Sequence, residues 1–248
     1  MNAKKKKKEP PKNAPPEESS WERFKANVRT IGGAILLAVF IRIVLFEAFE
    51  IDGPSMEPTL QHGDRVVVAK MLYGLFLPRM HEAVETWGGP APGDVVIVNS
   101  PADGVDIVKR VIGVGGDTIE IRDGQLIRNG EAIPRRMIGP CDNDRQKEPD
   151  DQCRVYEETI NGLPYQISHA EGWVELDRGE IEIPEGHIYV RGDHRDHSND
   201  STNPMIGPVP ISRVKGKALF IYLSCDERDE GWFFCGAPRW ERFFMSVN

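Results

Sequence analysis

Three polar segments of this chain carry residue types suited to nucleophilic catalysis. The first, at 51–64, reads IDGPSMEPTLQHGD and places Ser55 in a turn stiffened by Gly53, Pro54 and Pro58. A serine in such a turn is usually structural, because its hydroxyl hydrogen-bonds locally. The hydroxyl becomes a useful nucleophile only when a histidine, a lysine or a carboxylate accepts its proton. The chain must therefore bring such a base to Ser55.

Lys109 is the most interesting candidate for this base. It lies in a predicted strand at 105–114, VDIVKRVIGV, where alternation places it on one face with Ile107 and Val111. Burial on an apolar face disfavours the ammonium and lowers a lysine pKa by up to about 3–5 units. A neutral amine could then act as a general base. The structural alternative is a lysine that extends its charge to solvent.

The third segment, at 191–204, reads RGDHRDHSNDSTNP. Its histidines, His194 and His197, leave open a Ser-His-Asp triad with Ser55, which spacing alone does not exclude. They lie three residues apart among aspartates, without a helix or a further spaced ligand set, so we predict no metal site.

The sequence beyond residue 50 predicts mostly β structure. Short β-branched runs lie between glycine, proline and aspartate residues, at 64–70, 93–100, 105–114, 118–121 and 187–192. The dipeptides Asp123-Gly124 and Asn129-Gly130 predict tight hairpins, because type I′ turns need positive φ at both central residues. Residues 135–180 are charged and irregular, which indicates an insertion. Residues 71–88 are apolar enough to touch lipid or line a groove, with core packing as an equal alternative.

The N-terminal region predicts a membrane anchor. Residues 31–46 are apolar except for Arg42, near the segment's end, where its side chain can reach the headgroups. Basic residues precede the run and acidic residues follow it, so the positive-inside rule places the N-terminus in the cytoplasm. A buried soluble helix is the alternative. The remainder of the chain is acidic, with a net charge of −8 overall, which argues against a nucleic-acid partner.

Four cysteines form two local pairs in the sequence. Because short loops close at the lowest entropic cost, we predict disulfides between Cys141 and Cys153 and between Cys225 and Cys235 in an exported domain.

The three segments, in this order behind an anchor, resemble bacterial type I signal peptidases. SMEPTL at 55–60 is similar to the family's nucleophile box, KRVIGVGGD at 109–117 to its lysine box, and GDHRDHSNDS at 192–201 to its last box. The resemblance implies a mostly β, barrel-like catalytic core with an inserted cap and one N-terminal transmembrane helix. The implied division is a disordered basic tail at 1–29, an anchor at 30–49, a core at 50–117 and 186–248, and a cap at 118–185.

The resemblance also implies the roles of individual residues. Ser55 would be the nucleophile, Lys109 the general base, and Ser198 the hydroxyl that orients the lysine amine. Asp200 would shape the same site, while Asp193 and Arg195 would brace the loop. The chain departs from the family at three positions: Gly53 replaces a serine that helps to hold the oxyanion in some members, Thr202 replaces an arginine, and His194 replaces an asparagine.

The function implied is removal of signal peptides from exported preproteins by acyl-enzyme chemistry, without a cofactor. The expected partners are signal peptides and membrane lipid. The expected location is the bacterial inner membrane, with a single span and the catalytic domain outside the cytoplasm. The alternatives are another Ser/Lys processing peptidase, such as one of a conjugation or pilin system, and a non-enzymatic membrane-tethered β module.

Overall fold

The computed structural model describes residues 19–76, 80–141, 153–226 and 235–247, and the chain divides into two compact units, residues 1–42 and 43–248. The first unit is dominated by helix α1 (Ser20–Val44). Ser19 caps this helix, because its Oγ accepts the N–H of Glu22 at 3.3 Å. The stretch from Ser20 to Ile41 is long and apolar enough to span a membrane.

The boundaries of this helix differ from those predicted. Residues 20–29 were expected to be disordered and are helical, because the Ser19 cap starts the helix eleven residues before the apolar run. The predicted anchor extends to residue 49, whereas the helix ends at Val44 and the chain continues as strand β1. Residues 1–18 of the predicted tail lie outside the described residues.

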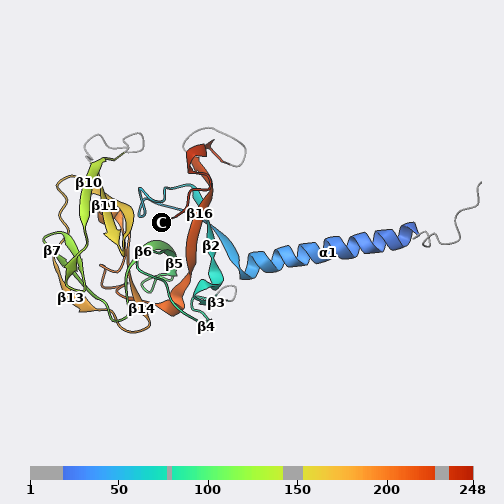
Figure 1. Ribbon diagram of the computed structural model, residues 1–248, viewed down its shortest axis with the longest axis horizontal. Coiled ribbons are helices and arrows are strands. Elements are labelled where there is room, and N and C mark those ends of the chain that lie inside the picture. Colours follow the sequence, from blue (N-terminus) through green and yellow to red (C-terminus); the bar gives the residue numbers. More distant parts are fainter. Residues whose placement is uncertain (1–18, 77–79, 142–152, 227–234, 248) are drawn as a thin grey trace, which may run out of the picture. The chain divides into compact units, whose positions relative to one another are not determined.

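The second unit is built on a large antiparallel sheet (Figure 1). Its strands run in the order β1-β2-β16-β5-β6-β14-β15, and β17 pairs with β16. Bulges in β16 shift its register against both neighbours, which bends the strand and curls the sheet into a half-barrel. The bounds are β1 (Phe46–Glu50), β2 (Asp64–Ala69), β5 (Val95–Asn99), β6 (Asp106–Val114), β14 (His187–Arg191), β15 (Val209–Pro210), β16 (Val214–Asp226) and β17 (Ala237–Pro238).

The chain between β6 and β14 forms two further sheets, although β6 and β14 pair directly. One sheet has the order β13-β7-β8-β9 and the other β10-β11-β12. Their strands are β7 (Thr118–Arg122), β8 (Gln125–Arg128), β9 (Glu131–Ala132), β10 (Arg135–Pro140), β11 (Cys153–Ile160), β12 (Leu163–Ala170) and β13 (Arg178–Glu182). These sheets occupy the predicted cap, but they lie in the same compact unit as the large sheet. A separate cap subdomain stays a prediction.

The remaining elements are short. They are the hairpin strands β3 (Gly74–Leu75) and β4 (Glu85–Thr86), and the 3-10 turns η1 (Lys70–Leu72), η3 (Arg195–His197), η4 (Ile211–Arg213) and η5 (Trp240–Arg242). Within the apolar segment 71–88, Tyr73 and Phe76 are buried, whereas Leu72, Val84 and Trp87 are exposed. Core packing therefore accounts for only part of this segment.

The structure confirms the mostly β fold and its local signals. All five predicted strands are present, with ends within two residues of those expected. Both central residues of the two predicted hairpin turns have positive φ, between 52° and 76°. Both predicted disulfides are present, with Cα atoms 5.3 Å apart for Cys141 and Cys153 and 5.5 Å apart for Cys225 and Cys235.

Candidate active site

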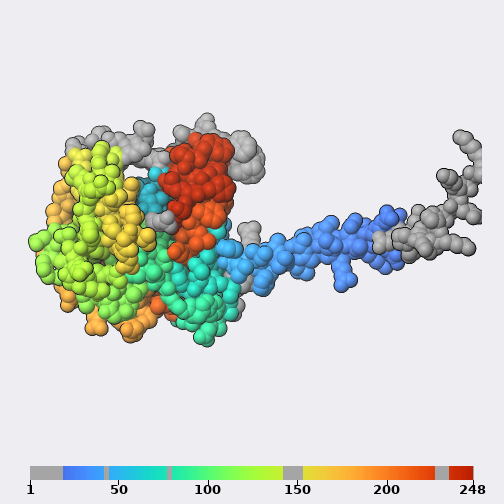
Figure 2. Space-filling view, in the orientation of Figure 1, coloured from blue at the N-terminus to red at the C-terminus, as the bar shows by residue number. Residues whose placement is uncertain are grey.

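Ser55 lies in the loop between β1 and β2, which the core holds at several points. The side chains of Met56 and Leu60 are buried in the apolar cluster formed by β2, β5 and β16. The backbone of Ile51 pairs with that of Asp64 and accepts the N–H of Gly63, which closes the base of the loop. These contacts leave Ser55 half-buried at the tip of an anchored turn. In Figure 2 this loop, in blue-cyan, is visible between the yellow strands β11 and β12 and the red C-terminal residues.

Lys109 comes from the middle of β6 and reaches this loop. Its Nζ lies 2.7 Å from Ser55 Oγ and 2.8 Å from the carbonyl oxygen of Val108. In the sheet register Lys109 pairs with Val96, whose side chain belongs to the same apolar cluster as Val111. The predicted apolar face is therefore present, and Lys109 is only 3% exposed. The alternative of a lysine extended to solvent is wrong.

Burial has a direct effect on this amine. Desolvation lowers the pKa of Lys109 to about 8, although the carboxylates of Asp200 and Asp193 act in the opposite direction. A minor fraction of the amine is therefore neutral near pH 7, and it lies at hydrogen-bonding distance from the serine hydroxyl. The fold thus brings together Ser55 and Lys109, the two residues on which the sequence prediction of the catalytic site depends.

Gly192 holds the third segment against the Ser55 loop. A Cβ at this glycine would lie 2.2 Å from Ser198 Oγ and 2.5 Å from the carbonyl oxygen of Ser55. The backbone N–H of His194 donates to the same Ser55 carbonyl at 3.2 Å. Only a residue without a side chain allows the two segments to approach this closely.

Asp200 braces the turn that follows Gly192. Its carboxylate accepts the N–H of Gly192 at 2.9 Å, the N–H and hydroxyl of Thr202 at 3.1 and 2.9 Å, and Nε of Arg191 at 3.3 Å. Burial would raise the pKa of Asp200, but Arg191 and these hydrogen bonds together lower it. Thr202 and Arg191 therefore satisfy the carboxylate in a chain that lacks the family's arginine at position 202.

Ser198 does not form the hydrogen bond that the resemblance implied. Its Oγ is buried and makes no hydrogen bond to Lys109 in the part of the chain that the structure describes, but it lies close enough to Asp200 to help lower the pKa of that carboxyl. The Lys109 amine donates hydrogen bonds to Ser55 and Val108 instead.

Gly53 is the position where some members of the family have a serine that helps to hold the oxyanion. It has φ +99° and donates its N–H to Nδ1 of His62 at 3.3 Å.

Two buried ion pairs around the site were missed by sequence reasoning, although Asp193 and Arg195 were expected to brace the loop. Arg110 is only 1% exposed and binds Asp193. Arg195 pairs with Glu158 of β11, which also accepts the Tyr165 hydroxyl at 2.6 Å. The sequence did contain a signal for the first pair, because Arg110 lies in the centre of an apolar strand and a buried guanidinium needs a carboxylate partner.

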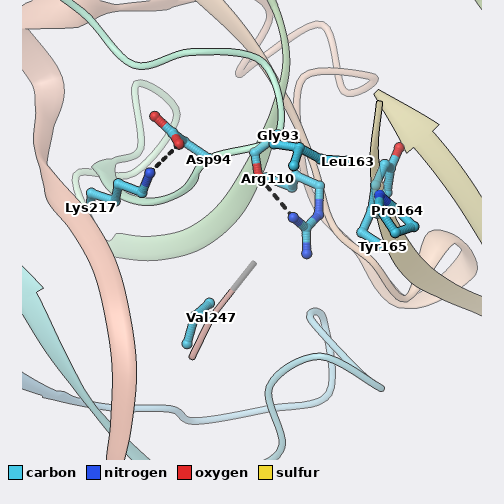
Figure 3. Close-up of a pocket in the computed structure, with 8 residues that line it drawn as sticks. All are labelled: Gly93, Asp94, Arg110, Leu163, Pro164, Tyr165, Lys217 and Val247. Carbon is cyan, nitrogen blue, oxygen red and sulfur yellow. Dashed lines mark hydrogen bonds and ion pairs between the residues drawn. The ribbon is translucent and has the colours of Figure 1, made fainter. Parts of the chain in front are cut away.

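The other side of Arg110 faces a small cavity of about 60 Å³ (Figure 3). Its Nη1 donates to the carbonyl oxygen of Gly93 at 2.8 Å, and its guanidinium lies 4.4 Å from the Tyr165 ring centroid. Leu163, Pro164 and Tyr165 of β12 line this cavity together with Lys217 of β16. Arg110 thus connects the inserted sheets with the large sheet.

Comparison with known proteins identifies the family of this chain. A family model described as "Signal peptidase, peptidase S26" matches residues 24–223. The chain belongs to this family. Signal peptidase I of Pseudomonas fluorescens is 31% identical over 204 residues, which cover 78% of this chain and 70% of that protein. Signal peptidase I of Bacillus licheniformis is 32% identical over 202 residues, which cover 81% of this chain and 89% of that protein.

Among solved structures, a signal peptidase I from Enterococcus faecalis V583 shares 26% sequence identity with this chain. The aligned region covers 52% of this chain and 97% of the Enterococcus chain, with a TM-score of 0.32.

Family membership confirms the predicted activity. The chain is a serine endopeptidase of the signal peptidase I type, and a conjugation-system peptidase or a non-enzymatic module is not favoured. The apolar helix α1 fits the membrane anchor expected of such an enzyme.

Proposed function

We propose that Ser55 is the nucleophile and Lys109 the general base of this signal peptidase. The observation that carries the proposal is the 2.7 Å contact between Lys109 Nζ and Ser55 Oγ, made by an amine whose pKa burial lowers to about 8. Hydrogen-bond reach and a pKa near the working pH are the two requirements for a general base. No histidine ring is needed for this step, so a Ser-His-Asp triad is not required.

The reaction then proceeds through an acyl-enzyme. The neutral amine of Lys109 accepts the hydroxyl proton as Ser55 Oγ attacks the scissile carbonyl carbon, and the ammonium returns a proton to the leaving amine. Water, activated by the same amine, hydrolyses the ester and releases the acyl product. No step needs a cofactor.

The oxyanion must be stabilised without a hydroxyl at position 53. We assign this role to the backbone N–H of Ser55. A side chain at Gly53 would have space, since nothing lies within 4 Å of an added Cβ, but its φ of +99° is unfavourable for other residues. The shaping role of Asp200 is proposed from the family resemblance, and so is an orienting role of Ser198, whose Oγ makes no hydrogen bond to Lys109 in this structure.

The substrate is proposed to be the signal peptide of an exported preprotein, cut after an Ala-x-Ala type site and bound as an added strand. The proposed orientation is a single span with the N-terminus in the cytoplasm, supported by the basic residues before α1 and by Glu47, Glu50 and Asp52 after it. Membrane lipid is the expected environment of α1, and the acidic domain makes nucleic acid an unexpected partner.

One assay tests the chemistry. The full chain in detergent should cleave a preprotein at its Ala-x-Ala site, and Ser55→Ala should abolish cleavage while the chain still melts at the wild-type temperature. Retained cleavage in Ser55→Ala would remove Ser55 as the nucleophile. Orientation is tested separately, because a reporter that is active only outside the cytoplasm should be active when fused after residue 248.

A further inference from the structure

The turn η3 and His194, the residue before it, gather three side chains whose donor atoms all lie within 4.8 Å of one another: His194, Asp196 and His197. The sequence argued against a metal here because it showed no helix to align the histidines. The 3-10 turn provides that alignment, with the two imidazole centroids 4.4 Å apart. The peptidase chemistry proposed above uses none of these three side chains.

The distances within the cluster match a metal coordination shell. Oδ1 of Asp196 lies 3.3 Å from Nε2 of His194 and 3.3 Å from Nδ1 of His197. Two ligands bound at about 2.0–2.1 Å to a tetrahedral zinc ion lie roughly 3.3 Å apart. Two edges of a tetrahedron are therefore already formed.

The nearest partners of the buried Asp196 Oδ1 are the two imidazoles of the cluster. The Asp196 side chain is only 7% exposed, yet its Oδ1 accepts no hydrogen bond from the residues that the structure describes. The other oxygen, Oδ2, accepts the backbone N–H of Ala170 at 2.8 Å, which fixes the orientation of the carboxylate. A buried carboxylate oxygen that faces two imidazole nitrogens is stabilised by a positive charge, and a cation bound among the three groups would supply it.

The surroundings of His194 select the tautomer that binds a metal. Its Nδ1 lies 3.2 Å from the carbonyl oxygen of Pro54, which can only accept a hydrogen bond. In the neutral ring Nδ1 therefore carries the proton, and Nε2 presents its lone pair towards Asp196. Metal-binding histidines usually donate their other N–H in this way.

We propose that His194, Asp196 and His197 bind a divalent transition-metal cation of the zinc type. Two imidazoles and one carboxylate suit such ions better than magnesium or calcium, which prefer oxygen ligands. The half-exposed His197 leaves the solvent side open for a water as fourth ligand. Because His194 also contacts Pro54 and Ser55, a bound ion would restrain the loop that carries the proposed nucleophile.

Titration of the metal-free chain with zinc tests the proposal. The full chain in detergent, dialysed against a chelator, should bind one zinc ion by calorimetry and should melt at a higher temperature with zinc present. Cobalt should give the visible absorption of a tetrahedral site. His194→Asn and His197→Asn should each weaken zinc binding by roughly tenfold or more, as expected for a disrupted metal shell.

The control is His81→Asn, which changes an exposed histidine outside the cluster and should leave zinc affinity unchanged. His197→Asn should fold normally, because its side chain is half exposed. The proposal is wrong if the wild-type chain binds no zinc, or if its zinc affinity is the same in both cluster variants. These measurements do not use peptidase activity, so their outcome is independent of the proposed Ser55 and Lys109 chemistry.

Discussion

Arg110 and Asp193 form two parallel hydrogen bonds, Nε to Oδ1 and Nη2 to Oδ2, each 2.8 Å long. Both side chains are only 1% exposed. The pair joins β6, which carries Lys109, to the loop after β14, and Thr59 Oγ1 from the Ser55 loop adds a 2.6 Å hydrogen bond to the same carboxylate. The three segments that carry the candidate site therefore meet at one buried carboxylate.

Removing this carboxylate should strongly destabilise the fold. Asp193→Asn leaves Arg110 as an uncompensated buried charge, so we expect a loss of about 3–5 kcal/mol in the free energy of unfolding. Urea unfolding of the detergent-solubilised chain measures this quantity. Asp106→Asn on β6, the strand that carries Arg110, is the matched control, because the ion pair of Asp106 with Lys215 is partly exposed and should contribute less than about 1 kcal/mol. Equal effects of the two variants would contradict this prediction.

Glu158 should make stability depend on acid pH. Burial alone would raise its pKa, but Arg195 and Arg135 together lower it to about 2. A depressed carboxyl pKa stabilises the folded state above the unfolded value, near 4.5, and this contribution is lost as pH falls towards 2. Wild-type stability should therefore fall between about pH 4.5 and 2, and Glu158→Gln should be less stable at pH 7 with a flatter slope. The same acid slope in both proteins would show that Glu158 is not the titrating group.

The sequence predicted the local parts of this structure well. The strand ends, the two glycine turns and the apolar face of Lys109 follow from periodicity and turn chemistry, which act within a few residues. The pairing of Ser55 with Lys109 was predictable only through the family resemblance, because 54 residues separate them. Arg110 and Asp193 are 83 residues apart, and their contact depends on a sheet register that one sequence does not specify.

The other differences between the sequence predictions and the structure also have physical causes. The start of α1 depends on the capping serine, Ser19, which outweighed the polar composition of residues 20–29. The cluster of His194 and His197 depends on a three-residue 3-10 turn, which has no strong sequence signal. The contact of Glu158 with Arg195 requires the inserted sheets to pack on the loop after β14, a tertiary contact that local patterns do not reveal.

Gly192 should not tolerate a methyl group. In Gly192→Ala the new Cβ would meet Ser198 Cβ at 2.4 Å and the Ser55 carbonyl oxygen at 2.5 Å, so one of the two segments must move. A displacement of about 1 Å at a catalytic group costs roughly 100-fold in rate, and we expect at least this loss in preprotein cleavage. Gly139→Ala is the control, because nothing lies within 4 Å of its added Cβ. Wild-type cleavage by Gly192→Ala would show that the two segments need not approach so closely.

The pH dependence of cleavage should report the amine of Lys109. Its pKa is lowered to about 8, so the fraction of neutral amine, and with it the cleavage rate, should rise with pH through an apparent pKa near 8. Lys109→Arg should remove turnover, because a guanidinium does not deprotonate in this range. Lys215→Met, which changes a partly exposed lysine on β16, should keep the wild-type profile.

Stability should show the same titration with a definite sign. The folded pKa of Lys109 is depressed, so the buried ammonium destabilises the native state below about pH 8, by about 3 kcal/mol at roughly 1.4 kcal/mol per pKa unit. This penalty is lost as pH rises from about 8 to the unfolded value of 10.5. Lys109→Met keeps much of the packing volume without the charge, so it should be inactive yet more stable than wild type at pH 7. Its advantage in the free energy of unfolding should shrink between pH 8 and 10.5. An active Lys109→Arg, or a Lys109→Met that is less stable than wild type at pH 7, would show that Lys109 is not a base with a lowered pKa. His194 and His197 would then become the candidates for the base.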